Sequence, residues 1–82
     1  MNLNLLVKLY ILEICDGPIS VPEKLPDYVP LAHLGYDEDI SLCRTLERRL
    51  QQLALQYSTG KQINTGLISE HTTVSQCISL VA

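Results

Sequence analysis

Two stretches of this 82-residue chain have the hydrophobic pattern of helices. Residues 3–15 are almost continuously apolar, and Lys8 and Glu13 are the charged interruptions. In residues 41–57 the apolar side chains recur at spacings of three, four, three and four, which is the period of an amphipathic helix. We therefore predict one largely apolar helix and one helix with a single buried stripe. The stripe consists of Cys43, Leu46, Leu50, Leu53 and Tyr57.

Local signals predict where these two helices begin and end. Asn2 or Asn4 can cap the first helix, and the Asp-Gly-Pro sequence at 16–18 ends it, because glycine accepts the left-handed conformation and proline cannot continue a helix. The acidic residues 37–39 suit the positive end of the second helix dipole. The Ser-Thr-Gly-Lys sequence at 58–61 ends that helix.

The segment between the two helices is rich in proline. Ser20 and Glu23 fit a capping box around Pro22, which predicts a short helix that Pro26 soon stops. Residues 26–30 are predicted to be extended or turning, and residues 31–35 to form one further helical turn.

Residues 62–81 are rich in strand-forming side chains, which predicts a C-terminal β-hairpin with its turn at 69–73. The expected fold is therefore α+β, with three main helices and a C-terminal hairpin in a single domain, 1–82. The strand formers are Thr65, Ile68, Thr72, Thr73, Val74, Ile78 and Val81.

Composition predicts a globular protein with an aliphatic core, because 46% of the residues are hydrophobic, 18% are charged, and Trp and Phe are absent. The net charge is −3, but it is unevenly distributed. Residues 41–61 hold four cations against Glu47, a net charge of +3, so the rest of the chain carries −6. This asymmetry can direct one face toward an anionic partner.

Cysteine usage and the N-terminal sequence predict a cytoplasmic protein. Cys15, Cys43 and Cys77 are odd in number and form no CxxC pair, which favours buried thiols in a reducing compartment. The apolar run at residues 3–15 is too short to span a bilayer. It also lacks the basic start and the cleavage site of a signal peptide.

The order of the predicted elements resembles the winged helix-turn-helix family. The resemblance is carried by GPIS before a capped helix, by SLCRTLERRLQQL as a recognition helix, and by GLISEHTTVSQCISLVA as a wing. It implies a small DNA-binding transcription regulator in which arginine and glutamine side chains read bases of double-stranded DNA in the major groove. The implied base-reading residues are Thr45, Arg48, Arg49 and Gln52, and the implied phosphate contacts are Arg44 and Lys61.

A protein-interaction module without nucleic-acid binding is the alternative. In it the helix 41–57 presents a solvated face, and Glu47 pairs with Arg44 across one turn. The negative net charge and Glu70 in the predicted wing favour this alternative. The apolar helix at 3–15 has more apolar positions than a one-sided surface helix needs, which predicts a homodimer formed through it.

No catalytic, metal or cofactor site is predicted. His33 and His71 have no Cys or His at metal-ligand spacing. The sequence at 58–61 resembles the end of a phosphate-binding loop but lacks the earlier glycine and the Ser or Thr after lysine. The carboxylates at 37–39 do not converge on one point without further ligands. We therefore expect a binding protein and not an enzyme.

Overall fold

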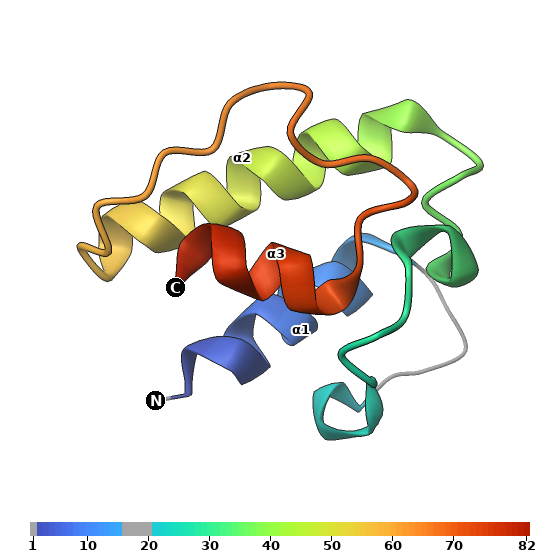
Figure 1. The fold of residues 1–82 in the computed structure, drawn as a ribbon, viewed down its shortest axis with the longest axis horizontal. Helices are drawn as coiled ribbons and strands as arrows, with labels where there is room; N and C mark the ends of the chain where they lie inside the picture. Colours follow the sequence, from blue (N-terminus) through green and yellow to red (C-terminus); the bar gives the residue numbers. More distant parts are fainter. Residues whose placement is uncertain (1, 16–20) are drawn as a thin grey trace.

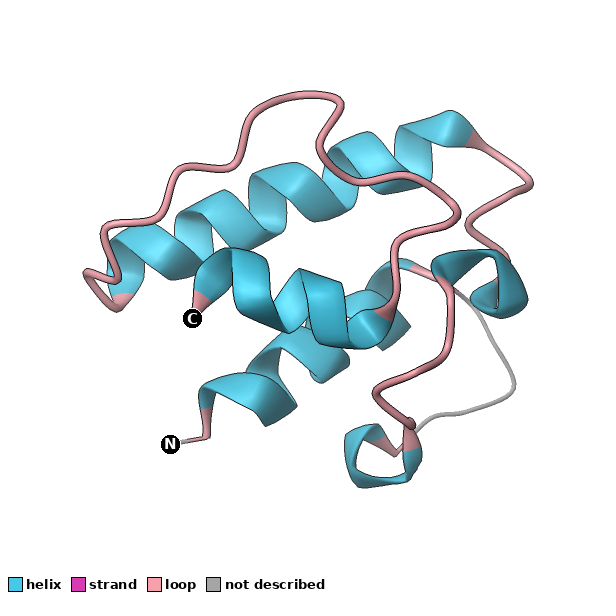
Figure 2. Cartoon of the chain, in the orientation of Figure 1, coloured by secondary structure: helices cyan, strands magenta, loops and turns pink. Residues whose placement is uncertain are grey.

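The chain folds into a bundle of helices (Figures 1 and 2). A computed structural model describes residues 2–15 and 21–82. This part of the chain contains one isolated antiparallel bridge, between Pro30 and Thr73, and no strand. The predicted α+β class is therefore wrong. The elements are α1 (Leu3–Ile14), the 3₁₀ helices η1 (Pro22–Lys24) and η2 (Leu31–Leu34), α2 (Ile40–Gln56) and α3 (Val74–Val81).

α1 confirms the first predicted helix. The Asn2 side chain caps its start by accepting a hydrogen bond from the Asn4 N–H at 3.0 Å. One side of α1 faces the core with Val7 and Ile11, which are fully buried. The predicted stop at 16–18 and the predicted cap Ser20 lie outside the described residues.

α2 confirms the second predicted helix and, apart from Tyr57, its buried stripe. Asp39 caps the helix by accepting a hydrogen bond from the Ser41 N–H at 2.9 Å, and this bond lowers the pKa of the Asp39 carboxyl. Leu46 and Leu50 are fully buried, as predicted. Tyr57 lies just beyond the last turn and is 41% exposed, so the buried stripe ends before it.

The predicted C-terminal hairpin is wrong, because its second half forms α3. The Thr73 side chain accepts from the Gln76 N–H at 3.2 Å, and the Gln76 side chain accepts from the Thr73 N–H at 2.9 Å. This capping box starts a helix. Burial on one helical face outweighs the strand preference of the β-branched residues. The buried residues are Val74, Cys77, Ile78 and Val81.

The first half of the predicted hairpin belongs to a loop that crosses α2. We call residues 58–68 the strap. In Figure 1 the strap, in orange, runs from the C-terminal end of α2 back along the helix and then leads toward α3. Ser58, Gly60 and Gly66 have positive φ angles, which allow its turns. Ile63 and Ile68 are buried and anchor the strap to the core.

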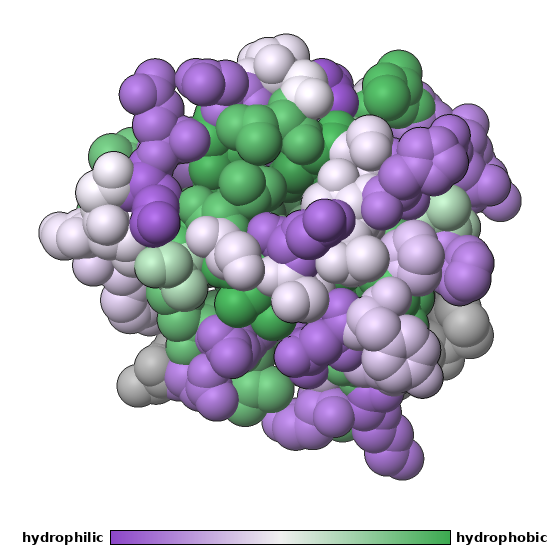
Figure 3. Space-filling model, in the orientation of Figure 1, coloured by the Kyte–Doolittle hydropathy of each residue, from purple (hydrophilic) through white to green (hydrophobic). Residues whose placement is uncertain are grey.

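The core lies between α1, α2 and α3 and is mostly aliphatic. Its one fully buried aromatic side chain among the described residues is Tyr36, which follows η2. The three cysteines are buried and form no disulfide among the described residues. Apolar side chains also reach the surface where the strap passes over α2, with hydrophilic side chains around them (Figure 3). None of the described helices is long and apolar enough to cross a membrane.

Candidate functional site

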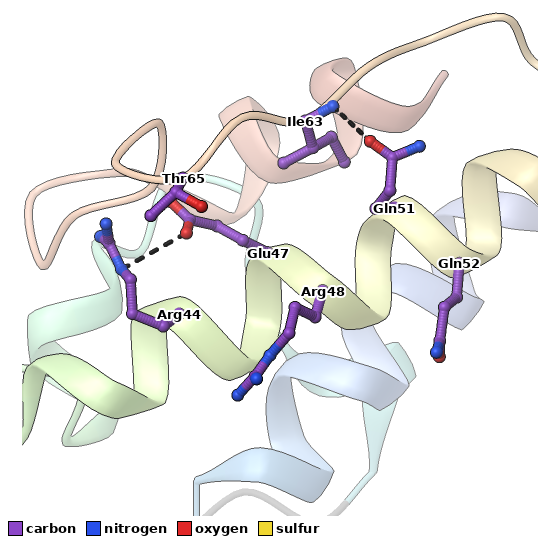
Figure 4. Close-up of a pocket in the computed structure, with 7 residues that line it drawn as sticks. All are labelled: Arg44, Glu47, Arg48, Gln51, Gln52, Ile63 and Thr65. Atoms are coloured by element: carbon purple, nitrogen blue, oxygen red, sulfur yellow. Dashed lines mark hydrogen bonds and ion pairs between the residues drawn. The ribbon is translucent and has the colours of Figure 1, made fainter.

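Gln51 joins α2 to the strap through both ends of its side-chain amide. Its Oε1 accepts a hydrogen bond from the Ile63 N–H at 2.6 Å, and its Nε2 donates to the Lys61 carbonyl at 3.5 Å (Figure 4). In a parallel sheet, one residue of a strand bonds a carbonyl and an N–H that lie two residues apart on the neighbouring strand. The Lys61 carbonyl and the Ile63 N–H have this spacing. The Gln51 side chain therefore takes the place of a strand partner for the strap.

Glu47 and Arg44 hold the strap one turn earlier on α2. The buried Glu47 Oε2 accepts from the Gly66 N–H at 2.9 Å and from the Ile68 N–H at 2.8 Å. Glu47 Oε1 lies 3.3 Å from Arg44 Nε, which confirms the predicted pairing of these residues. Arg44 Nη2 also donates to the Ile68 carbonyl at 2.7 Å. Two backbone donors and a guanidinium thus compensate the buried carboxylate.

A shallow groove follows the boundary between α2 and the strap, and we call it the α2–strap groove. It consists of two hollows of about 520 and 590 Å³, and Gln51 lines both. The first is lined by Arg44, Glu47, Arg48, Gln51, Gln52, Ile63 and Thr65. The second is lined by Gln51, Ala54, Leu55, Ser58, Gly60, Lys61 and Gln62.

The groove is cationic. It contains three cations against one carboxylate, and the carboxylate of Glu47 is already bonded within the fold. Arg48 and Lys61 are exposed, and neither side chain forms an ion pair with any described residue. Leu55 adds an apolar side chain that is 70% exposed. The groove can therefore attract an anionic group and cover an apolar one.

The structure brings together four of the six residues predicted to bind DNA. Arg44, Arg48 and Gln52 line the first hollow, and Lys61 lines the second. Figure 4 shows Arg48 and Gln52 extending from α2 away from the strap. Arg44 differs from the other three, because its guanidinium forms an ion pair with Glu47 and donates a hydrogen bond to the Ile68 carbonyl.

The other two predicted residues lie outside the groove. Arg49 faces α1, where its Nη2 lies 3.7 Å from Glu13 Oε2 and its guanidinium lies 5.4 Å from the centre of the Tyr10 ring. The Thr45 hydroxyl donates to the Ser41 carbonyl one turn earlier, at 2.9 Å. Arg49 therefore lies apart from Arg44 and Arg48, which both line the first hollow, so the three arginines of α2 do not share one face.

The sequence prediction missed Gln51, Leu55 and the strap-holding role of Glu47. A signal for Glu47 was present, since it lies four residues after Cys43 and three before Leu50, within the buried arc of the helix. A carboxylate at such a position is almost always paired. No comparable signal marked Gln51, because its partners come from a loop whose path was not predicted.

The described residues offer neither a metal-binding cluster nor, at Cys43 and Cys77, an activated thiol. No group of three His, Cys, Asp or Glu side chains in this part of the chain is placed to hold a metal ion. Burial raises the pKa of Cys77 to about 12 and also raises the pKa of Cys43, so both thiols stay protonated and unreactive near neutral pH. The side chains that line the groove offer charges and hydrogen-bonding groups to a ligand.

Comparison with known proteins gives no relative from which a role could be carried over. The chain matches no protein-family model and shows no significant similarity to a curated protein or to a solved structure.

Proposed function

We propose that this domain is a protein-interaction module whose α2–strap groove binds an acidic segment of a partner protein. The observation that carries the proposal is the pair of exposed cations, Arg48 and Lys61, which have no ion-pair partner among the described residues. They lie in the cationic part of a chain whose net charge is −3. Charge complementarity of this kind steers association and gives specificity.

The remaining lining of the groove suits a polypeptide. Leu55 offers an exposed apolar contact next to the buried Ala54. Gln52 offers both a donor and an acceptor for backbone groups of the partner. Arginine is frequent among the side chains that contribute most to protein interfaces, which fits the exposed position of Arg48.

The surroundings of α2 favour a protein partner over double-stranded DNA. A recognition helix enters the major groove with its exposed face free of neighbouring elements. Here the strap lies along one side of α2, and α1 contacts the other side through Arg49. Arg44 and Arg49 already have partners within the fold. DNA binding remains the second candidate, on the strength of Arg48, Gln52 and Lys61.

Fluorescence anisotropy with three labelled probes tests the proposal. The probes are a short peptide with a leucine between glutamates, the same peptide with lysines in place of glutamates, and a short DNA duplex. The acidic peptide should bind, and its affinity should fall as salt rises. Binding of the duplex but not of the acidic peptide, with a log–log salt slope of about −0.9 per neutralised phosphate, would instead establish DNA binding.

Lys61 has a matched control elsewhere on the chain. Lys61→Ala should weaken the binding of the acidic peptide by on the order of 1 kcal/mol, because it removes one exposed ionic contact. Lys24→Ala removes the same charge from η1, outside the groove, and should leave the affinity nearly unchanged. Equal losses in both variants would mean that only the net charge of the chain matters and would contradict a site in the groove.

A further inference from the structure

The strap depends on side chains of α2 for its attachment. Within residues 61–68 the backbone forms one hydrogen bond with another backbone group among the described residues, from the Leu67 N–H to the Asn64 carbonyl at 3.2 Å, and this bond is internal. At the start of the strap, Ser58 and Thr59 donate to backbone carbonyls of α2, but the hydrogen bonds from residues 61–68 to α2 reach the side chains of Gln51, Glu47 and Arg44. Residues 61–68 are therefore attached to α2 by five hydrogen bonds with these three side chains, and to the core by two buried isoleucines.

These polar contacts lie directly at the wall of the groove. Gln51 bonds the backbone of Ile63, and the Ile63 side chain lines the first hollow. Gln51 also bonds the carbonyl of Lys61, whose side chain lines the second hollow. Glu47 fixes the strap just beyond Thr65, which lines the first hollow as well.

We infer that Gln51 and Glu47 are positioning residues, which latch the strap against α2 and so set the groove in which the partner segment is bound. This inference rests on the function proposed above. A wall that is held in place before binding loses less conformational entropy when the partner arrives. Loss of the Gln51 latch should therefore reduce affinity without changing the charge of the groove.

Gln51→Ala tests the latch without altering any charge. In the free protein, amide hydrogen exchange at Ile63 should become faster, because its bond to Gln51 is lost. The affinity for the acidic peptide should fall by about fivefold, or about 1 kcal/mol. The salt dependence of the affinity should keep its slope. Gln56→Ala, on an exposed side chain of α2 that lines neither hollow, should change none of these.

Gly66→Ala separates latching from direct contact with the peptide, because Gly66 lines neither hollow. Its φ angle of 95° lies in the left-handed region, where alanine is strained. An added Cβ would lie 3.6 Å from Arg44 Nη1, an ordinary contact, so the strain is in the backbone of the strap. Gly35→Ala is the matched control, since Gly35 has a φ of 99° with open space around it and lies outside the strap.

The two variants give decisive outcomes. Faster exchange at Ile63 or Ile68 together with weaker peptide binding, in Gln51→Ala and Gly66→Ala but not in the controls, supports the latch. Faster exchange with unchanged affinity would overturn the positioning role. If the wild-type protein binds no acidic peptide, the proposed function fails and the positioning role fails with it. Exchange at Ile63 and Ile68 then still decides whether these side chains hold the strap.

Discussion

The Tyr36 hydroxyl donates a hydrogen bond to the Ile11 carbonyl at 2.7 Å, across 25 positions of the chain. Tyr36 follows η2, and Ile11 lies in α1. Both side chains are buried, so the bond links the first helix to the segment that leads into α2. The bond therefore helps to position the N-terminal end of α2 relative to α1. α2 in turn forms one wall of the groove.

Tyr36→Phe should lower the free energy of unfolding by about 1 kcal/mol, because it removes this hydrogen bond and keeps the ring. The loss should not be larger, since the Ile11 carbonyl also accepts from the Cys15 N–H at 3.3 Å. Urea unfolding measures the difference. Tyr28→Phe is the control, because Tyr28 is 78% exposed and should show no change. Equal stability of wild type and Tyr36→Phe would mean that the buried hydroxyl bond contributes nothing.

Stability should fall as the pH rises above 9. Burial raises the pKa of Cys77 from 9.0 to about 12, and burial also raises the pKa of Tyr36. At a pH between these two pKa values, the Cys77 thiol is deprotonated in the unfolded chain and still protonated in the folded chain. The unfolded state then binds fewer protons, so the free energy of unfolding decreases with pH. Urea unfolding at several pH values between neutral and strongly alkaline measures this slope.

Cys77→Ala tests whether this thiol causes the loss of stability at alkaline pH. The variant should be less stable at neutral pH, because it leaves a small cavity. Its free energy of unfolding should nevertheless fall less steeply above pH 9 than that of the wild type. Parallel slopes for the two proteins would show that Cys77 does not contribute to the pH dependence.

Leu50→Ala should lower the free energy of unfolding by about 2–4 kcal/mol, through lost burial and a cavity in the core. Leu50 is fully buried in the middle of α2. Leu55→Ala, on the same helix but 70% exposed, should change stability by less than about 0.5 kcal/mol. Thermal melts compare the two variants. Similar melting temperatures would contradict the assignment of the buried face.

Periodic burial made α1 and α2 predictable, whereas the C-terminal third was not. Residues 74–81 combine strand-forming side chains with a helical spacing of buried positions. The capping box of Thr73 and Gln76 stabilises the start of the helix and so favours it over a strand. The cations of the groove, Arg44, Arg48 and Lys61, were all among the residues predicted to bind DNA. The latch could not, because it depends on where a loop crosses α2, and local sequence does not encode that contact.

Self-association through α1 stays a prediction. Leu5, Leu6 and Leu9 are only partly buried, so the helix still presents apolar surface. If a second copy covers this surface, sedimentation of the wild type should show dimers at high concentration. Leu9→Glu should then shift the protein to monomers, because a charge would be buried in the interface. A wild type that is monomeric at every concentration would contradict this prediction.

A charge swap tests the central claim, that the α2–strap groove binds an acidic segment. Calorimetric titration compares the wild type with Arg48→Glu/Lys61→Glu, using the glutamate and lysine peptides. The wild type should bind the glutamate peptide and the swapped variant the lysine peptide, because the exposed charges of the groove are reversed while the latch is kept. A swapped variant that melts like the wild type and still binds the glutamate peptide equally well would contradict the account.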